Sequence, residues 1–309
     1  MNVVAIGECM VEFSPRPEGG YRQSFGGDTL NFAVYLARLG IAVDYATLLG
    51  DDDFSREMIA AWQREGIGTG PVETVPGRTP GLYVVRTDDK GERTFHYWRD
   101  AAPAREMFAP GRLPALAKRL ARHDWIYLSG ITLSLGGRDG RRGLFAMLEA
   151  FRERGTKVAF DGNYRPRNWA GDADEARAAF SSMNKRCDLA LPTFEDERAL
   201  FGYDDPRALA ERLLRKGAAE VVVKLGAKGC LVATADGIEA VAGDADPRPV
   251  DTTAAGDSFN AGYLAARLKG LQPVAAAHCA NRLAAEVIRH PGAIIPAEAM
   301  PRMLLEDVA

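Results

Sequence analysis

Hydrophobic and polar positions alternate in blocks along most of this 309-residue chain. Short apolar runs, bounded by glycine, proline or charged residues, recur between longer segments whose apolar residues are three or four positions apart. Short runs of this kind are typical of buried strands, and the longer periodicity is typical of amphipathic helices. Strands and helices that follow one another in this way build a mostly parallel sheet with helices on both faces. The pattern therefore predicts an α/β fold.

The bounds of the expected elements follow from these blocks. Strands are expected at residues 1–9, 43–49, 125–129, 157–161, 189–191 and 220–225, and helices at 32–39, 54–65, 113–122, 138–154, 174–185 and 206–216. A hairpin at 229–241 and two or three helices follow, the longest at 274–289. Gly40 is expected to end the first helix. Ligands of such sheets bind beyond the carboxyl ends of the strands, where the sequence has Gly130, Asp161, Asn163, Arg165, Thr193, Lys224, Asp251 and Asp257.

Two further segments alternate residue by residue between polar and apolar. One lies at 11–25, and the other contains two such runs, 81–87 and 92–99, around the turn-forming residues 88–91. Alternation of this kind indicates hairpin strands that are buried on one face only. We expect a small antiparallel sheet made from about 11–25 and 72–100, which forms a lid on a single domain that spans 1–309.

The last strand of this lid carries large rings on both faces. Phe95, Tyr97 and Arg99 share one face, and His96 and Trp98 share the other. The rings can simply pair across strands. Alternatively, one face closes over a ligand and the other packs on a second subunit. Because a two-sided aromatic lid would be a sticky patch on a monomer, we expect a homodimer through the lid, and higher assembly is left open.

Composition narrows the class of protein. The net charge of −3 argues against nucleic acid or an anionic membrane as partner. The N-terminus has no secretory signal, and no uncharged run approaches the roughly 20 residues of a membrane span. The four cysteines are scattered without a CxxC spacing, so we expect reduced thiols in a cytoplasmic protein. The four histidines lack the spacing of metal ligands.

The stretch from Asp251 to Leu264 carries the clearest chemistry. It passes through the small residues Ala254, Ala255 and Gly256 and places Asp257 where a helix should begin. Small residues let the backbone approach a ligand, and the free N–H groups of a first helical turn favour an anion. Asp257 either caps the helix or takes a proton from the group that attacks the bound anion. In the second case the stretch is a site of phosphoryl transfer.

Two other loops are open to two interpretations each. The glycines of Lys224–Gly229 either stabilise a turn or let the backbone lie along a nucleotide. The arginines at 165 and 167 either pair within their own loop or bind a carboxylate or phosphate. Burying two arginines at a strand end without an anionic ligand would be costly, which favours the second interpretation for at least one of them. Neither a P-loop nor the dinucleotide-binding glycine pattern is present, which argues against those enzyme classes.

With these residues identified, the chain resembles the ribokinase-like (PfkB) carbohydrate kinases over nearly its whole length. Asp251–Leu264 resembles their C-terminal motif, whose core is usually Gly-Ala-Gly-Asp, and Gly26–Gly40 resembles their N-terminal motif. The resemblance implies a three-layer α/β sandwich with a mostly parallel central sheet and a β lid. It also implies a kinase that uses ATP and Mg²⁺ to phosphorylate a sugar hydroxyl.

Carried over position by position, the resemblance assigns roles to individual residues. Asp257 matches the catalytic base, and Ala254, Ala255 and Gly256 match an anion hole that contacts the nucleotide. Asp196 falls where the family often has a glutamate that binds magnesium through water. Ala254 replaces a usual glycine, which is tolerable if its φ stays negative. Whether K⁺ binds near Asp251 is left open. The other nucleotide-binding positions are Thr193, Lys224, Leu225, Gly226, Ala227, Lys228, Gly229 and Asn281.

Within the family, several stretches resemble kinases of 2-keto-3-deoxy sugar acids, namely 27–31, 81–83, 86–89, 97–99 and 163–167. A sugar acid has a carboxylate that arginines can bind, whereas an unpaired buried guanidinium beside a neutral sugar is penalised. We therefore expect transfer to the C6 hydroxyl of 2-keto-3-deoxygluconate. The alternatives are a kinase of fructose, ribose or another deoxy-keto acid, a non-catalytic sugar-acid sensor, and a dinucleotide-dependent oxidoreductase. The expected substrate-binding residues are Gly27, Asp28, Asn31, Tyr83, Tyr97, Arg99, Arg165 and Asp257.

Overall fold

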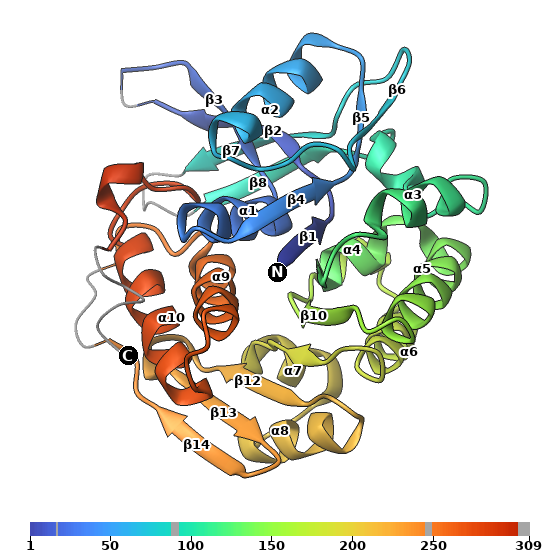
Figure 1. Ribbon diagram of the computed structural model, residues 1–309. Helices are drawn as coiled ribbons and strands as arrows, with labels where there is room; N and C mark the ends of the chain where they lie inside the picture. The colour runs from blue at the N-terminus through green and yellow to red at the C-terminus, as the bar shows by residue number, and fades with distance from the viewer. Residues whose placement is uncertain (17, 88–92, 245–248, 302–309) are drawn as a thin grey trace.

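A central sheet of eight strands organises the structure, a computed structural model that describes residues 1–16, 18–87, 93–244 and 249–301 (Figure 1). The strands from β12 to β4 are parallel, and β13 and β14 form an antiparallel edge. The predicted α/β class with a mostly parallel sheet is confirmed. In spatial order the strands are β14 (Gly237–Val241), β13 (Cys230–Thr234), β12 (Glu220–Lys224), β11 (Leu189–Ala190), β10 (Lys157–Asp161), β9 (Trp125–Ser129), β1 (Asn2–Ile6) and β4 (Ala42–Ala46).

Helices cover both faces of this sheet, because the strands are apolar on both sides. In β1, Val3 and Ala5 belong to one hydrophobic core, and Val4 and Ile6 belong to the other. The first core is closed by α1 (Asp28–Arg38), α2 (Asp53–Arg64), α9 (Ala255–Leu268) and α10 (Pro273–Val287). The second core is closed by α3 (Leu113–Leu120), α4 (Gly130–Leu135), α5 (Gly137–Arg152), α6 (Ala173–Met183), α7 (Phe194–Phe201) and α8 (Pro206–Arg215).

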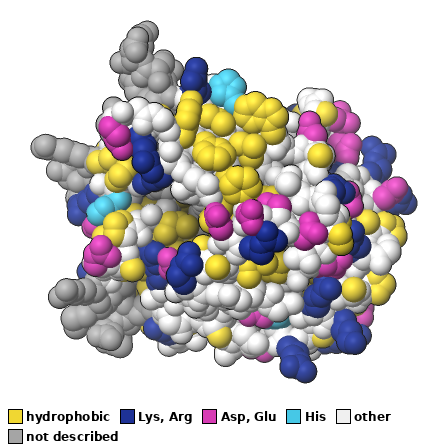
Figure 2. Space-filling model, turned by 90° about the horizontal axis from the view of Figure 1, so that it is seen from above, with side chains coloured by type: hydrophobic (Ala, Val, Ile, Leu, Met, Phe, Trp, Pro, Cys, Tyr) yellow, Lys and Arg dark blue, Asp and Glu magenta, His cyan; other side chains and the backbone are white. Residues whose placement is uncertain are grey.

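A separate four-stranded sheet lies at the top of Figure 1. Its order is β3 (Tyr21–Gly26), β2 (Met10–Pro15), β7 (Leu82–Thr87) and β8 (Arg93–Trp98). Two antiparallel hairpins are joined through β2 and β7, which run parallel. The expected hairpin turn at 88–91 lies outside the described residues. Figure 2, which looks onto this part of the molecule from above, shows hydrophobic side chains gathered on its surface.

The prediction of one strand at 43–49 is wrong. β4 ends at Ala46, and the next residues form β5 (Leu48–Gly50), which pairs with β6 (Glu73–Val75) in a two-stranded sheet of its own. The carbonyl of Thr47 accepts a hydrogen bond from the backbone N–H of Glu73, so the chain changes partner at this residue. For the same reason β6 does not join the lid, where the expected range of 72–100 had placed it.

Helix ends depend on nearby residues more than strand pairing does, and the first of them was predicted correctly. Gly40 has φ of 78°, and its backbone N–H bonds to Ala37, so it ends α1 as expected. The short helices α4 and α7, of six and eight residues, were not anticipated. No helix in the described ranges is long and apolar enough to span a membrane.

The order of the parallel strands fixes where a ligand can bind. The chain leaves β1 for β4 on one side and later returns to β9 on the other side of β1. Such a switch in direction opens a crevice at the carboxyl ends of the two strands. Gly7 and Glu8 follow β1 at that edge, Gly130 follows β9, and Asp161 ends β10.

Candidate active site

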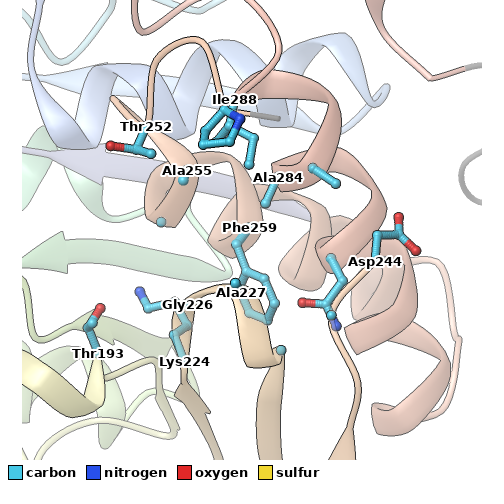
Figure 3. Close-up of a pocket in the computed structure, with 16 residues that line it drawn as sticks. Thr193, Lys224, Gly226, Ala227, Asp244, Thr252, Ala255, Phe259, Ala284 and Ile288 are labelled. Atoms are coloured by element: carbon cyan, nitrogen blue, oxygen red, sulfur yellow. The ribbon is translucent and has the colours of Figure 1, made fainter. Parts of the chain in front are cut away.

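The first turn of α9 forms one wall of the site at this edge. Ala254 is the residue that precedes the helix, and Ala255, Gly256 and Asp257 form its first turn. The backbone N–H groups of such a turn have no partner inside the helix and attract an anion. Figure 3 shows Ala255 and Thr252 at the rim of a pocket that lies below this turn.

Ala254 adopts the left-handed conformation, with φ of 61° and ψ of 14°. The condition under which alanine would be tolerable here, a negative φ, is therefore not met. This conformation leads the chain from Thr253 into the first turn of α9, and glycine would adopt it without strain. The Cβ atom of an L-residue crowds the backbone there, at about 1–2 kcal/mol.

We expect Ala254→Gly to stabilise the protein by about 0.5–1 kcal/mol, because relief of strain exceeds the added chain entropy of the unfolded state. Urea unfolding measures this gain. Ala255→Gly is the matched control, since Ala255 lies inside the helix, where glycine is expected to destabilise by about 0.5–1 kcal/mol. Equal effects of the two substitutions would contradict the prediction.

Asp257 is buried, and its Oδ2 accepts a hydrogen bond of 2.8 Å from Nδ2 of Asn31 in α1. Burial raises its pKa well above the ordinary value, and the nearby charge of Asp28 raises it further. Asn31 and Lys224 act in the opposite direction. A carboxylate with a raised pKa is a stronger proton acceptor near neutral pH than an exposed aspartate. The interpretation of Asp257 as a helix cap is wrong, because Ala254 is the cap residue of α9 and no side chain of the described residues caps this helix end.

The start of α1 lies opposite this turn. Asp28 Oδ2 accepts a hydrogen bond of 2.6 Å from Nδ2 of Asn163, and burial raises the pKa of Asp28. A side chain cannot be placed on Gly27, because a Cβ atom there would lie 2.3 Å from the carbonyl oxygen of Glu8. Gly27, Asp28 and Asn31, all predicted site residues, thus come together with Asp257 at one place.

Lys224 ends β12 and lies beside the same turn of α9. Its Nζ donates to Asp161 Oδ1 and to Asn260 Oδ1, each at 2.9 Å. Asn260 in turn donates to the hydroxyl of Tyr127 at 3.0 Å. A buried cation is thereby held among polar partners at the floor of the site.

A pocket of about 410 Å³ opens next to Lys224 (Figure 3). The turn after β12 forms one side, with Gly226 and Gly229 at positive φ of 61° and 91° as a tight glycine turn requires. Of the predicted nucleotide-binding residues, eight line the pocket and three do not. Those that line it are Thr193, Lys224, Gly226, Ala227, Gly229, Ala255, Gly256 and Asn281, and those that do not are Leu225, Lys228 and Ala254.

Sequence reasoning missed most of the opposite side of this pocket. Ala284, Ala285 and Ile288 present a small apolar surface from the end of α10, and Phe259 adds a ring from α9 (Figure 3). Such a slot suits the flat, apolar faces of a nucleotide base. The sequence shows Ala284 and Ala285 close to Ile288. It does not show that α10 lies opposite the turn after β12, so these residues could not be assigned to the pocket. The remaining missed lining residues are Gly243, Asp244, Pro249 and Thr252.

The lid residues predicted to bind substrate already have protein partners. Tyr83 donates from its hydroxyl to Glu12, and its ring stacks on Tyr97 with centroids 5.4 Å apart. Arg99 pairs with Glu8, whose side chain is only 1% exposed. Burial raises the pKa of Glu8, and Arg99 lowers it. Glu8, which sequence reasoning missed, thus neutralises the guanidinium of Arg99, which was expected to bind the carboxylate of the substrate.

The loop after β10 differs from its expectation. Arg165 and Arg167 are both exposed, so the argument from the cost of burying two arginines does not hold. Arg165 lies 3.5 Å from the carboxylate of Asp196. Arg167 stacks on the ring of Tyr97 at 3.9 Å and donates to its hydroxyl, which joins this loop to the lid. Both guanidinium groups remain accessible from solvent.

Asp196 and Thr193 do not form a complete set of ligands for a magnesium ion. No cluster of three or more His, Cys, Asp or Glu suited to a metal occurs in the part of the chain that the structure describes. Asp196 also accepts a hydrogen bond of 3.2 Å from the backbone N–H of Tyr164. Magnesium often keeps several waters and takes its other ligands from phosphates and one or two carboxylates. A single aspartate that acts through water is compatible with that chemistry.

Glu197 is buried beside this region, and its Oε2 has no hydrogen-bond partner among the described residues. Burial raises its pKa from 4.5 to about 7. The folded state therefore holds a proton that the unfolded state loses, and stability should fall by up to about 3 kcal/mol as pH rises from about 4 to 8.

Glu197→Gln removes the charge, so its advantage over the wild type in urea unfolding should be small at pH 5 and largest at pH 8. Glu195→Gln on the same helix is the control, since the Glu195 side chain is 66% exposed and should show no such pH dependence. A constant difference between Glu197→Gln and the wild type across this range would rule out the assigned proton.

Known proteins agree with this architecture. A model of the pfkB family carbohydrate kinases matches residues 1–300. The chain is 44% identical over 307 residues to 2-dehydro-3-deoxygluconokinase of Dickeya dadantii (strain 3937), and 43% identical over 306 residues to the kinase of that name from Escherichia coli (strain K12). Each alignment covers 97% of this chain and 98% of the relative.

A crystal structure of fructokinase from Vibrio cholerae O395, in fructose-, ADP- and calcium-bound form, has a TM-score of 0.83 and 26% identity. The match covers 99% of this chain and 98% of that one, which agrees with the expected ribokinase-like sandwich. Together with the family match over residues 1–300, these similarities establish that the chain belongs to the pfkB family of carbohydrate kinases.

Proposed function

We propose that this kinase transfers the γ-phosphoryl group of ATP to the C6 hydroxyl of 2-keto-3-deoxygluconate, giving 2-keto-3-deoxy-6-phosphogluconate and ADP. One observation carries the reaction type: the buried carboxylate of Asp257 lies in the first turn of α9, between the pocket and the start of α1. The substrate is supported by the identity of 43–44% with two 2-dehydro-3-deoxygluconokinases.

In the proposed reaction Asp257 accepts the proton of the attacking hydroxyl. Gly27, Asp28 and Asn31 bind the sugar beside it. Tyr83, Tyr97, Arg99 and Arg165 bind the acid end. Arg165 supplies the charge for the carboxylate, because the charge of Arg99 is already balanced by Glu8 and Arg99 can add only a hydrogen bond. Backbone N–H groups of residues 255–257 stabilise the charge of the transferring phosphoryl group.

ATP occupies the pocket beside α10 in this proposal, with its phosphates toward Ala254–Gly256. The predicted nucleotide-binding residues that line the pocket contact ATP, and the apolar side from Ala284 to Ile288 holds the base. Mg²⁺ would supply positive charge at the phosphates, and Asp196 would hold it through water. Because ATP is a cytoplasmic metabolite, we place the protein in the cytoplasm.

A coupled ADP-release assay over a panel of substrates tests the function. The panel contains 2-keto-3-deoxygluconate, its C4 epimer, gluconate, fructose and ribose. We expect the highest kcat/KM with a 2-keto-3-deoxy acid, and mass spectrometry should find one added phosphoryl group on the product. Fastest turnover of fructose or ribose would overturn the substrate assignment, and no ATP-dependent product with any sugar would favour a sensor.

We also propose that the protein is a homodimer through the lid. Trp98 is 61% exposed, Tyr21 42% and Phe95 36%, and all three lie on strands of the lid sheet. Exposed aromatic groups of this kind mark interaction surfaces.

Trp98→Glu should therefore convert the dimer to a monomer in light scattering coupled to size exclusion. Phe54→Glu, which changes an equally apolar and 37% exposed residue on α2, is the control and should leave the mass unchanged. A monomeric wild type would contradict the proposal.

A further inference from the structure

Lys224 is a cation that the fold has buried between the pocket and a group of carboxylates. It is only 6% exposed. Its Nζ makes two hydrogen bonds of 2.9 Å, to Asp161 and to Asn260. An ammonium group has three N–H donors, so these two contacts leave one donor for a further acceptor. Burying a charge is costly unless it is paired, and the carboxylate of Asp161 is the partner that pairs with it here.

The ammonium group lies next to the turn that would hold the transferring phosphate. A Cβ atom built on Gly256 would be 3.8 Å from Nζ of Lys224. Figure 3 shows Lys224 with Thr193 on the floor of the pocket, below the first turn of α9. An anion held by the backbone N–H groups of that turn would thus be within reach of the ammonium group.

The charges around this point are mostly negative. Asp28, Asp161 and Asp257 lie close enough for the charges of Asp28 and Asp161 to raise the pKa of Asp257. The hydrogen bond from Asn31 lowers this pKa, and so does the positive charge of Lys224. Triphosphate would add several more negative charges. Within the described ranges, Lys224 alone among the residues lining the pocket is a lysine or arginine. Charge balance therefore calls for its ammonium group when phosphate is bound.

We propose that Lys224 is a catalytic residue whose third N–H binds the transferring phosphoryl group, while Asp161 and Asn260 hold the ammonium in place. The inference rests on the proposed kinase reaction. In that step the C6 oxygen forms a bond to the γ-phosphorus, and its proton passes to Asp257. The bond from the γ-phosphorus to the bridging oxygen breaks, and its electron pair stays on ADP. Lys224 keeps its proton and stabilises charge on the phosphoryl oxygens.

A purely structural ion pair with Asp161 is the competing explanation, and the chain offers a way to separate the two. Lys224→Met alone leaves the Asp161 carboxylate buried without its cation, which destabilises a protein strongly. The double variant Lys224→Met with Asp161→Asn removes both charges, so neither is left unpaired. A structural pair can be replaced in this way without loss of catalysis, but a catalytic cation cannot.

The test compares the wild type, Lys224→Met and the double variant by thermal unfolding and by steady-state kinetics. We expect the double variant to regain most of the wild-type Tm, whereas kcat stays about 10²–10³-fold low in both variants and KM for the sugar changes less than about threefold. Recovery of kcat to within about tenfold of the wild type in the double variant would overturn the proposal. So would a normal kcat with a raised KM for ATP only.

A second readout comes from the pH profile of kcat. Because Lys224 lowers the pKa of Asp257, its removal should move the acid limb of Lys224→Met to higher pH, and an unmoved limb would count against the proposal. All measurements use whichever sugar of the panel the wild type turns over fastest. Failure of the keto acid as substrate would therefore leave the result for Lys224 interpretable.

Discussion

Asp257→Asn is expected to lose about 10²–10⁴-fold or more in kcat, with KM for both substrates changed by less than about threefold. Asparagine has the same size as aspartate and still accepts the hydrogen bond from Asn31, but it cannot take a proton. The wild-type kcat should fall on the acid side with an apparent pKa above the ordinary value near 4 of an aspartate, since burial and the charge of Asp28 raise it. Below that pKa the carboxyl is protonated and inactive as a base.

A neighbouring substitution controls for disturbance of the helix. Ser258→Ala removes a hydroxyl of the same turn, which donates to the carbonyl of Ala255 at 3.1 Å, and it should leave kcat nearly unchanged. Steady-state kinetics from pH 5 to 9 compares the three proteins. A kcat of Asp257→Asn within threefold of the wild type would falsify the assignment of Asp257 as base.

Arg165→Ala is expected to raise KM for the keto acid about 10–100-fold while KM for ATP stays within about threefold. A charge-assisted hydrogen bond contributes about 1.5–3 kcal/mol. The half-exposed guanidinium of Arg165 donates a hydrogen bond of 2.9 Å to the backbone carbonyl of Tyr164 and lies 3.5 Å from Asp196. Because the group is half exposed, it can turn from these two contacts to a ligand. The separate KM values from initial-rate kinetics measure the effect.

Arg165→Lys distinguishes charge from shape. Lysine keeps the positive charge but lacks the planar fork that matches a carboxylate, so we expect an intermediate KM for the acid. If KM for ATP and KM for the acid rise together in Arg165→Ala, Arg165 serves the phosphates or the Asp196 side of the site instead.

Most of the central sheet could be predicted because its strands are locally encoded. The bounds of β9 and β10 agree with the apolar runs at 125–129 and 157–161. The break at Thr47 could not be predicted, because it depends on pairing with Glu73 in a later strand. The parallel contact between β2 and β7 has the same cause, since register between distant strands is decided by packing and not by either strand alone.

The site residues also divide into those that local sequence predicts and those that depend on distant contacts. Asp257 and Asn31 each lie in a helix whose start the sequence marks, and the two residues, both predicted for the site from their motifs, lie within hydrogen-bond distance of each other. Glu8 was missed because its importance comes from Arg99, which lies 91 positions away in the chain. The sequence offered one signal for Glu8, namely that a charged residue closely follows the buried strand β1. The φ of Ala254 could not be predicted, because residue identity alone does not report backbone conformation.

The hydrogen bond between Asn31 and Asp257 joins residues 226 positions apart. During synthesis, which runs from the N-terminus, the residues of α1 and the lid therefore leave the ribosome well before Asp257. A nascent chain that ends before α9 has the residues proposed to bind the sugar but lacks the turn proposed to hold phosphate. Kinase activity should thus appear only near completion of translation, so an unfinished chain is not expected to consume ATP.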